Sequence, residues 1–210
     1  MSLVAAPQTP LERFNGQTFR VLLDCLARPG KIGQLPPPPF TNVPSPADGT
    51  PPQLTAIAAC MSLLDQTVGF VHAINQTWLP INHPLSRWIT VRSNVRMLTP
   101  SMADFALLHD LASIALLPEL PVGTMLYPEQ SCTVFLCVPT LVAGGSTLRL
   151  AGPGIATTVT VGLPEATPNE LAVLTVRRGQ FPLGIDLFLI DRQSRCLGLP
   201  RTTEITLCRY

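Results

Sequence analysis

The chain has 210 residues, of which 46% are hydrophobic and 13% charged, and its formal net charge is +1. This length suits one well-filled core or at most two small domains. Typical soluble domains carry roughly 25% charged residues. Because this chain has so few charges, we expect part of its surface to be apolar and to contact a partner. The basic residues are scattered, with Arg177–Arg178 the only adjacent pair, which argues against nucleic-acid binding.

No segment is typical of export or of membrane insertion. MSLVAAPQTP lacks the basic and apolar regions of a signal peptide. The most apolar stretch, LHDLASIALLPELPVGTMLY, is interrupted by Asp110, Glu119 and two prolines, whereas a spanning helix needs about 20 mostly apolar residues. We therefore expect a cytoplasmic protein without membrane contact, whose six cysteines are reduced thiols.

The first predicted element in chain order is a helix within residues 9–30. Thr9 and Glu12 have the spacing of a capping box, and a Pro-Gly pair ends the segment. Gly16 weakens the early part, so a start near Asn15 is the alternative. Four apolar residues have the spacing of one helix face and are expected to form a buried stripe: Phe19, Leu22, Leu23 and Leu26.

A proline-rich arm follows at about residues 36–53. Eight of the 23 prolines lie between Pro36 and Pro52, and proline excludes regular helix or central strand. The flanking segments are too short to fold alone. We therefore expect an irregular arm or lid inside one domain that spans 1–210, rather than an interdomain linker.

Beyond the arm, apolar patterning predicts alternating helices and strands. We expect helices at 52–65, near Pro84 and at 168–179. We expect strands at 67–73, 104–108, 132–138, 146–155, 157–162, 185–191, 196–200 and 204–208. Segment 143–147 is expected to be a hairpin loop, and 111–117 is ambiguous between helix and strand. Strands that are apolar on both faces imply a sheet covered on both sides. The predicted fold is a single three-layer α/β/α domain with a mixed sheet, antiparallel near the C-terminus.

Motifs for common catalytic chemistry are missing from the sequence. The histidines His72, His83 and His109 have no metal-ligand spacing, and His72 is expected to be a hydrogen-bonded core residue. Neither a phosphate-binding loop nor a nucleophile elbow is present. The one lysine, Lys31, follows a Pro-Gly turn and is expected to be exposed, which argues against Schiff-base chemistry. We expect no metal and no cofactor.

Charged residues within apolar segments are the remaining candidates. Asp186 lies in LGIDLFL and Arg201 follows another apolar run. Because a buried charge needs a partner, we favour a structural ion pair between them. The alternative is a pocket for a phosphate-bearing ligand, which arginine binds in bidentate fashion.

Four segments resemble the H subunit of the bacterial carbon–phosphorus lyase machinery: FRVLLDCLARPG at 19–30, LRLAGPGI at 148–155, FPLGID at 181–186 and LPRTT at 199–203. They occur in the same order, and the last two are the most specific. The resemblance implies a cytoplasmic component of phosphonate breakdown that joins the G, I and J subunits in a core complex. With an ATP-binding subunit, that complex displaces adenine from ATP with a phosphonate.

The same resemblance implies a fold like that of pyridoxal-phosphate-dependent transferases, without the cofactor. It also implies a homodimer when isolated and no independent catalytic activity. It brings no established catalytic residues. The matching polar positions are candidates for an interface, for fold support or, ranked lower, for a pocket: Arg20, Asp186, Arg201, Thr202 and Thr203. The alternatives are a self-sufficient enzyme or binding protein with an anion pocket around Arg201 and Asp186, and a pyridoxal-phosphate enzyme.

Overall fold

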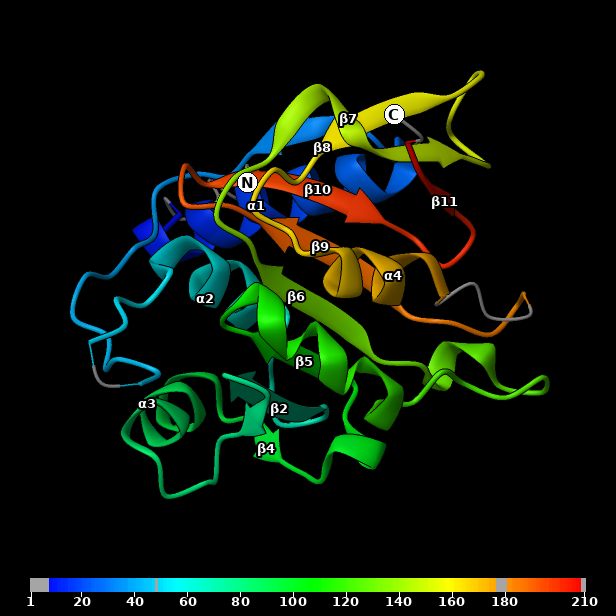
Figure 1. Ribbon diagram of the computed structural model, residues 1–210. Helices are drawn as coiled ribbons and strands as arrows, with labels where there is room; N and C mark the ends of the chain where they lie inside the picture. Colours follow the sequence, from blue (N-terminus) through cyan, green and yellow to red (C-terminus); the bar gives the residue numbers. More distant parts are fainter. Residues whose placement is uncertain (1–7, 48, 177–180, 209–210) are drawn as a thin grey trace, which may run out of the picture.

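A computed structural model describes residues 8–47, 49–176 and 181–208. Its main sheet contains, among these residues, eight strands: β1 (Ile32–Gln34), β2 (Gly69–Ile74), β3 (Thr77–Trp78), β4 (Arg96–Met97), β5 (Phe105–Leu108), β6 (Thr133–Cys137), β9 (Asp186–Ile190) and β10 (Arg195–Leu199). The strand order is β1-β10-β9-β6-β5-β2-β3, and β4 pairs with β2 off this path. Figure 1 shows β2, β5, β6 and β9 side by side at the centre.

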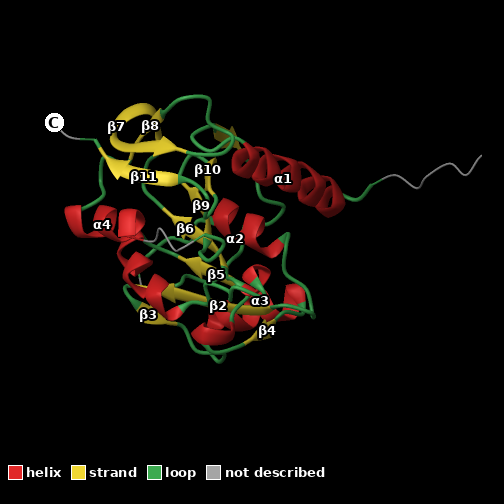
Figure 2. Ribbon diagram, turned by 90° about the vertical axis from the view of Figure 1, so that its right-hand side faces the viewer, coloured by secondary structure: helices red, strands yellow, loops and turns green. Residues whose placement is uncertain are grey.

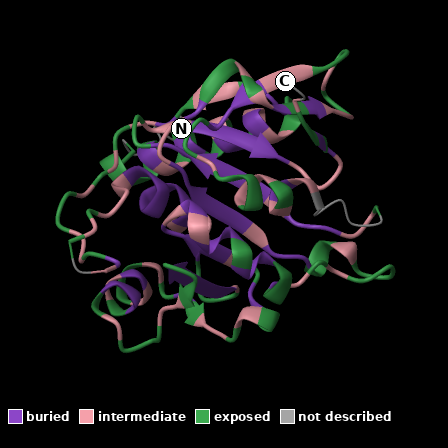
Figure 3. Ribbon diagram, in the orientation of Figure 1, coloured by how far each residue is buried: buried purple, intermediate pink, exposed green. Residues whose placement is uncertain are grey.

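The central strands run parallel, and the C-terminal edge is antiparallel. β2, β5, β6 and β9 pair in parallel, whereas β10 is antiparallel to both β9 and β1. The sequence of β6 explains why this strand lies at the centre of the sheet. Val134 and Leu136 pack into the core on one face, and Phe135 and Cys137 pack into the core on the other. The central strands are buried throughout most of their length (Figure 3). The predicted mixed sheet with antiparallel C-terminal pairing is confirmed.

Three helices cover one face of the sheet: α1 (Pro10–Ala27), α2 (Leu54–Met61) and α3 (Pro84–Ser93). In Figure 2, α1 and α2 lie to the right of the sheet and α4 (Pro168–Val176) to its left. The predicted capping box of α1 is confirmed. Thr9 Oγ1 accepts from the Glu12 N–H at 3.2 Å, and the Glu12 carboxylate accepts from the Thr9 N–H at 2.7 Å. The helix therefore begins at Pro10 rather than near Asn15.

The predicted apolar stripe of α1 is wrong in part. Phe19 is 54% exposed and Leu23 is 56% exposed. The residues of α1 that are buried are Phe14, Thr18, Leu22 and Cys25. The helix is thus rotated about its axis relative to the expected stripe, because it packs closely against β1 and β10.

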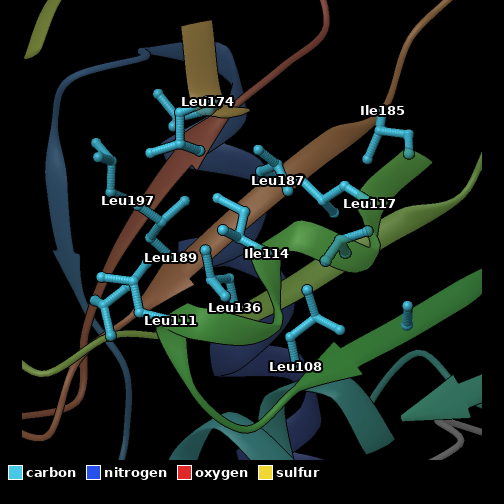
Figure 4. Packing of buried hydrophobic residues seen from close by; sticks show 14 of the residues in the cluster. Leu108, Leu111, Ile114, Leu117, Leu136, Leu174, Ile185, Leu187, Leu189 and Leu197 are labelled. Atoms are coloured by element: carbon cyan, nitrogen blue, oxygen red, sulfur yellow. The ribbon is translucent and has the colours of Figure 1, made fainter. Parts of the chain in front are cut away.

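The other face of the sheet is covered by helix and by a second sheet. Its elements are the 3-10 helix η2 (Leu111–Glu119), α4, and an antiparallel sheet of β7 (Val142–Ala151), β8 (Val159–Gly162) and β11 (Glu204–Leu207). Figure 4 shows residues of the main sheet, η2 and α4 packed together in this core: Leu136, Leu189, Ile114, Leu117 and Leu174. The third layer therefore differs from the all-helical layer expected, and the ambiguous segment 111–117 is a 3-10 helix.

Two local predictions are settled by the second sheet. The predicted strand pair at 146–155 and 157–162 is present as β7 and β8, but β7 ends at Ala151. Segment 143–147 is not a hairpin loop, because it lies inside β7 at an irregularity between Ala143 and Leu148. There a Cβ on Gly145 would lie 2.5 Å from the Gly162 Cα, so this close backbone approach requires glycine.

The proline-rich arm packs against α3, with Phe40 in edge-to-face contact with Trp88 at a centroid distance of 4.9 Å. Two short 3-10 helices complete the described chain: η1 (Pro100–Met102) and η3 (Pro128–Gln130). Residues 177–179 of the predicted helix 168–179, Arg177 and Arg178 included, lie outside the described residues. Within the part of the chain that is described, no helix is long and apolar enough to cross a membrane.

Candidate functional site

Asp186 and Arg201 form a bidentate ion pair. Arg201 Nε and Nη2 donate to Asp186 Oδ1 and Oδ2 at 3.2 and 2.7 Å, and the Arg201 backbone N–H donates to Oδ1 at 2.8 Å. The Arg201 and Asp186 side chains are 17% and 22% exposed. The third guanidinium nitrogen, Nη1, donates to the Pro128 carbonyl at 2.6 Å. Each guanidinium nitrogen is thus engaged within the chain, as in a structural ion pair.

This ion pair supports an exposed apolar loop. Asp186 begins β9, and Pro128 begins η3 in the segment 121–131, whose Val122 carbonyl also accepts from the Gly184 N–H at 2.9 Å. Large side chains that are at least 41% exposed gather on this loop and on the segment before β9. We call them the η3 loop surface, and they are Val122, Met125, Leu126, Tyr127 and Phe181.

The other predicted candidates do not join the pair. Arg20 is exposed on α1, and among the described residues it makes no hydrogen bond or ion pair with Asp186 or Arg201. Thr202 is half-buried in the turn before β11. The Thr203 N–H donates to the Pro200 carbonyl at 2.8 Å, and the Thr203 side chain is buried.

A cavity of about 510 Å³ lies at the carboxyl ends of the parallel strands. Its sheet side is lined by the first residues after β5, β6 and β9, among them His109, Val138 and, two positions beyond β9, Arg192. Its other wall is Pro38 and residues 50–55, which are parts of the proline-rich arm and the start of α2. Crevices outside the carboxyl ends of strands are where ligands bind in open α/β sheets.

Beside this cavity lies a buried chain of hydrogen bonds whose direction can be assigned. Ser86 Oγ donates to the Pro80 carbonyl at 2.8 Å and must therefore accept from His72 Nε2 at 2.7 Å. Burial lowers the pKa of His72 well below 6.5 and that of His109 to about 3, so both rings are neutral at pH 7. His72 Nδ1 consequently accepts from His109 Nε2 at 3.0 Å. His72 is thus a hydrogen-bonded core residue, as predicted.

The assignment leaves His109 Nδ1 as a bare hydrogen-bond acceptor. This buried nitrogen has no partner among the described residues, and neither has the buried Oε1 of Gln53. Gln53 Nε2 donates to the Val138 carbonyl at 3.1 Å, which fixes the amide at the cavity. Buried polar atoms without partners are rare in native structures, and both residues line the cavity.

Asp191 holds the β9 end of the cavity in place. It is 1% exposed. Its Oδ1 accepts from the Gln193 and Arg195 N–H groups, both at 2.9 Å. Its Oδ2 accepts from the Leu141 N–H at 3.1 Å and from Arg195 Nε at 2.7 Å. This carboxylate therefore fixes the turn that carries Arg192 and the loop after β6.

The cavity residues were missed in the sequence because they come from distant segments. His109 and Asp191 each directly follow a predicted apolar strand, however, and polar residues there lie at the carboxyl edge of a parallel sheet. That position is the signal that could have indicated them. Searched over its described residues, the chain has no group of three or more His, Cys, Asp or Glu side chains placed to hold a metal ion.

Comparison with known proteins assigns the family. The sequence model of one protein family, bacterial phosphonate metabolism protein (PhnH), matches residues 11–206 of this chain. The chain belongs to this family. The resemblance found in four sequence segments is therefore confirmed.

Two curated relatives extend the match. The chain is 32% identical over 194 residues to the "Alpha-D-ribose 1-methylphosphonate 5-triphosphate synthase subunit PhnH" of Rhizobium meliloti (strain 1021), covering 89% of this chain and 88% of the relative. It is 28% identical over 189 residues to the "Putative C-P lyase subunit protein HtxG" of Stutzerimonas stutzeri, covering 90% and 84%. Both relatives are named as subunits.

Proposed function

We propose that this chain is a subunit of alpha-D-ribose 1-methylphosphonate 5-triphosphate synthase in phosphonate catabolism. The observation that carries the proposal is the family match across residues 11–206, together with the relative of that name at 32% identity. The synthase transfers the ribose 5-triphosphate moiety of ATP to a phosphonate and releases adenine. Because Asp186 and Arg201 bond to each other, we infer that they stabilise the fold or an interface rather than form an anion pocket of a self-sufficient enzyme.

The proposal includes the wider properties that the family resemblance implies. The chain acts in the cytoplasm with the G, I and J subunits of the carbon–phosphorus lyase core complex, and pairs with itself when isolated. Its fold is related to that of pyridoxal-phosphate-dependent transferases without the cofactor. In support, Lys31 Nζ donates to Asp24 at 2.7 Å on the exposed surface, and Lys31 is not among the residues that line the cavity.

The η3 loop surface is the proposed contact with another subunit of this complex. Leu126 is 84% exposed and Met125 is 67% exposed, and apolar surface of this kind marks protein interaction sites. The ion pair of Arg201 with Asp186, and its bond to Pro128, hold the loop in a fixed position. A preordered loop loses less conformational entropy on binding.

Replacing Leu126 with aspartate should therefore disrupt assembly. A carboxylate buried in an apolar contact is costly to desolvate, so recovery of the other core subunits with the tagged chain should fall about tenfold, which corresponds to about 1.4 kcal/mol. Val91→Asp on α3 is the matched control, since Val91 is 82% exposed, and it should leave recovery unchanged. Equal recovery with both variants would refute the η3 loop surface as the contact.

The function itself is tested by growth on methylphosphonate as the sole phosphorus source. Deleting the gene should abolish growth, and the wild-type chain should restore it. Val91→Asp should restore growth as well, whereas Leu126→Asp should not. Normal growth of the deletion strain would overturn the proposed function.

A further inference from the structure

We propose that the exposed face of α1 packs against α1 of a second copy of this chain, with the two helices antiparallel about a two-fold axis. Five residues make up this face, which we call the α1 surface: Glu12, Gly16, Phe19, Leu23 and Ala27. Self-pairing of the isolated chain is part of the proposed function, and this inference deepens that proposal by assigning the surface that performs it.

The α1 surface is one continuous stripe. Its residues follow the spacing i, i+4, i+7, i+11 and i+15, which keeps them within about 80° of arc at roughly 3.6 residues per turn. All five are exposed, and the residues that α1 buries against the sheet lie on the far side of the helix. Figure 2 shows α1 along the outside of the molecule, and no described helix or strand lies beyond it.

The middle of the stripe is apolar. Phe19 and Leu23 are each more than half exposed, and they lie about one turn apart on the same side of the helix. α1 therefore carries two apolar stripes, of which the fold of one chain buries only one. A second stripe directed toward solvent is typical of an interaction surface.

Gly16 has no packing role within the described chain. A glycine inside a helix is unfavourable relative to alanine, and a Cβ at Gly16 would meet no atom within 4 Å. At Gly33, Gly145 and Gly198, by contrast, a Cβ would lie less than 3 Å from other atoms of the chain. A second helix that packs closely against α1 gives Gly16 the same role as these glycines.

The stripe is complementary to itself when two copies pack antiparallel. Phe19 then lies opposite Leu23 of the second copy, and Gly16 lies opposite Ala27. Large residues thus meet in the middle and small residues meet at the ends, where the backbones can come within the usual interaxial distance of about 8–10 Å. Each contact occurs twice, as in other two-fold interfaces.

The charges at the two ends of α1 favour the antiparallel direction. Glu12 lies in the first turn, whereas Arg28 and Lys31 follow the last turn and share one carboxylate, Asp24. This end therefore keeps a net positive charge. Antiparallel packing brings it next to Glu12 of the second copy, and it also opposes the two helix dipoles. Parallel packing would place Glu12 beside Glu12, and like charges repel.

Sedimentation velocity of the full chain tests the proposal. One helix from each copy makes a contact smaller than a standard interface of about 1,200 Å² or more. We therefore expect a micromolar dissociation constant, with monomer at about 1 µM and dimer at about 100 µM. Phe19→Asp should raise the dissociation constant at least about tenfold, because a carboxylate is costly to desolvate. Val91→Asp, on the exposed side of α3, should dimerise like the wild type.

Gly16→Leu tests the close approach of the second helix. Leucine is a better helix former than glycine, and its Cβ meets no atom of the chain within 4 Å, so the variant should fold. The added side chain should nevertheless raise the dissociation constant about tenfold or more, since it separates the two helices. Gln17→Leu is the matched control. It adds the same side chain at the next exposed position, which lies off the stripe, and should dimerise like the wild type.

Three results would overturn the inference: a wild type that is monomeric at about 100 µM, wild-type dimerisation of Phe19→Asp, or equal dimerisation of Gly16→Leu and Gln17→Leu. A monomeric wild type that recovers the other core subunits only when Phe19 is intact would assign the α1 surface to one of those subunits instead. The outcome is separable from the subunit role. A monomeric chain that is still needed for growth on methylphosphonate refutes only this inference, whereas a dispensable chain that dimerises through α1 refutes only the subunit role.

Discussion

Replacing Asp191 with alanine is expected to lower the free energy of unfolding by about 2–4 kcal/mol, because a buried donor that loses its acceptor costs about 1–3 kcal/mol. The carboxylate is 1% exposed and accepts four hydrogen bonds from groups of Leu141, Gln193 and Arg195. Its loss leaves the buried Leu141 N–H and the Arg195 guanidinium without their partner. Domains are typically stable by only about 5–15 kcal/mol, so urea denaturation should detect the change easily.

Asp65→Ala is the matched control for this prediction. Asp65 is also an aspartate that accepts hydrogen bonds, but it is exposed and its bonds go to Thr67, two residues away. Its replacement should have a much smaller effect. Equal losses in the two variants, or a loss below about 1 kcal/mol for Asp191→Ala, would show that Asp191 does not hold the β9 end of the cavity.

Acid should destabilise the fold through His72 and His109. Burial lowers the pKa of His72 well below 6.5 and that of His109 to about 3, whereas both titrate near 6.5 in the unfolded chain. As the pH falls below about 6.5, the unfolded state therefore binds protons that the folded state does not. Stability should fall by about 1.4 kcal/mol per pH unit for each histidine, and the contribution of His109 should continue down to about pH 3.

His109→Gln separates this effect from that of other acidic groups. The glutamine amide can still donate to His72 Nδ1 but does not titrate, so the pH slope of the unfolding free energy should decrease by about 1.4 kcal/mol per pH unit. Urea denaturation at pH 7.5, 6.0 and 5.0 measures the slope. An identical slope in wild type and variant would mean that His109 is already protonated in the folded protein.

The central strands were predicted well because they are continuous runs of apolar residues. Segments such as 132–138 have no polar face, and only a strand buried on both sides satisfies them. The rotation of α1 was not predictable by the same reasoning. It depends on glycines of β1 and β10: a Cβ at Gly198 would lie 2.6 Å from the Cys25 carbonyl carbon, and one at Gly33 would lie 2.8 Å from Cys25 Sγ. Close packing there buries Cys25 and leaves Phe19 exposed.

The two candidate sites differ in what the sequence could reveal. Asp186 and Arg201 were recognisable in the sequence because each is a charged residue beside an apolar run. A buried charge needs a partner, and this requirement predicted that the two residues pair. The cavity depends instead on the parallel order of β5, β6 and β9, which brings His109 and Asp191 to one edge. No local spacing encodes that neighbourhood, and the unpaired state of His109 Nδ1 is visible only in three dimensions.

Product formation by purified components is the most direct test of whether this chain is a required subunit of the synthase. The core complex and its ATP-binding subunit are assembled with or without this chain and supplied with ATP and methylphosphonate. We expect ³¹P NMR to show ribose 1-methylphosphonate 5-triphosphate, and adenine to be released, only when the chain is present. Equal product formation in its absence would contradict the account.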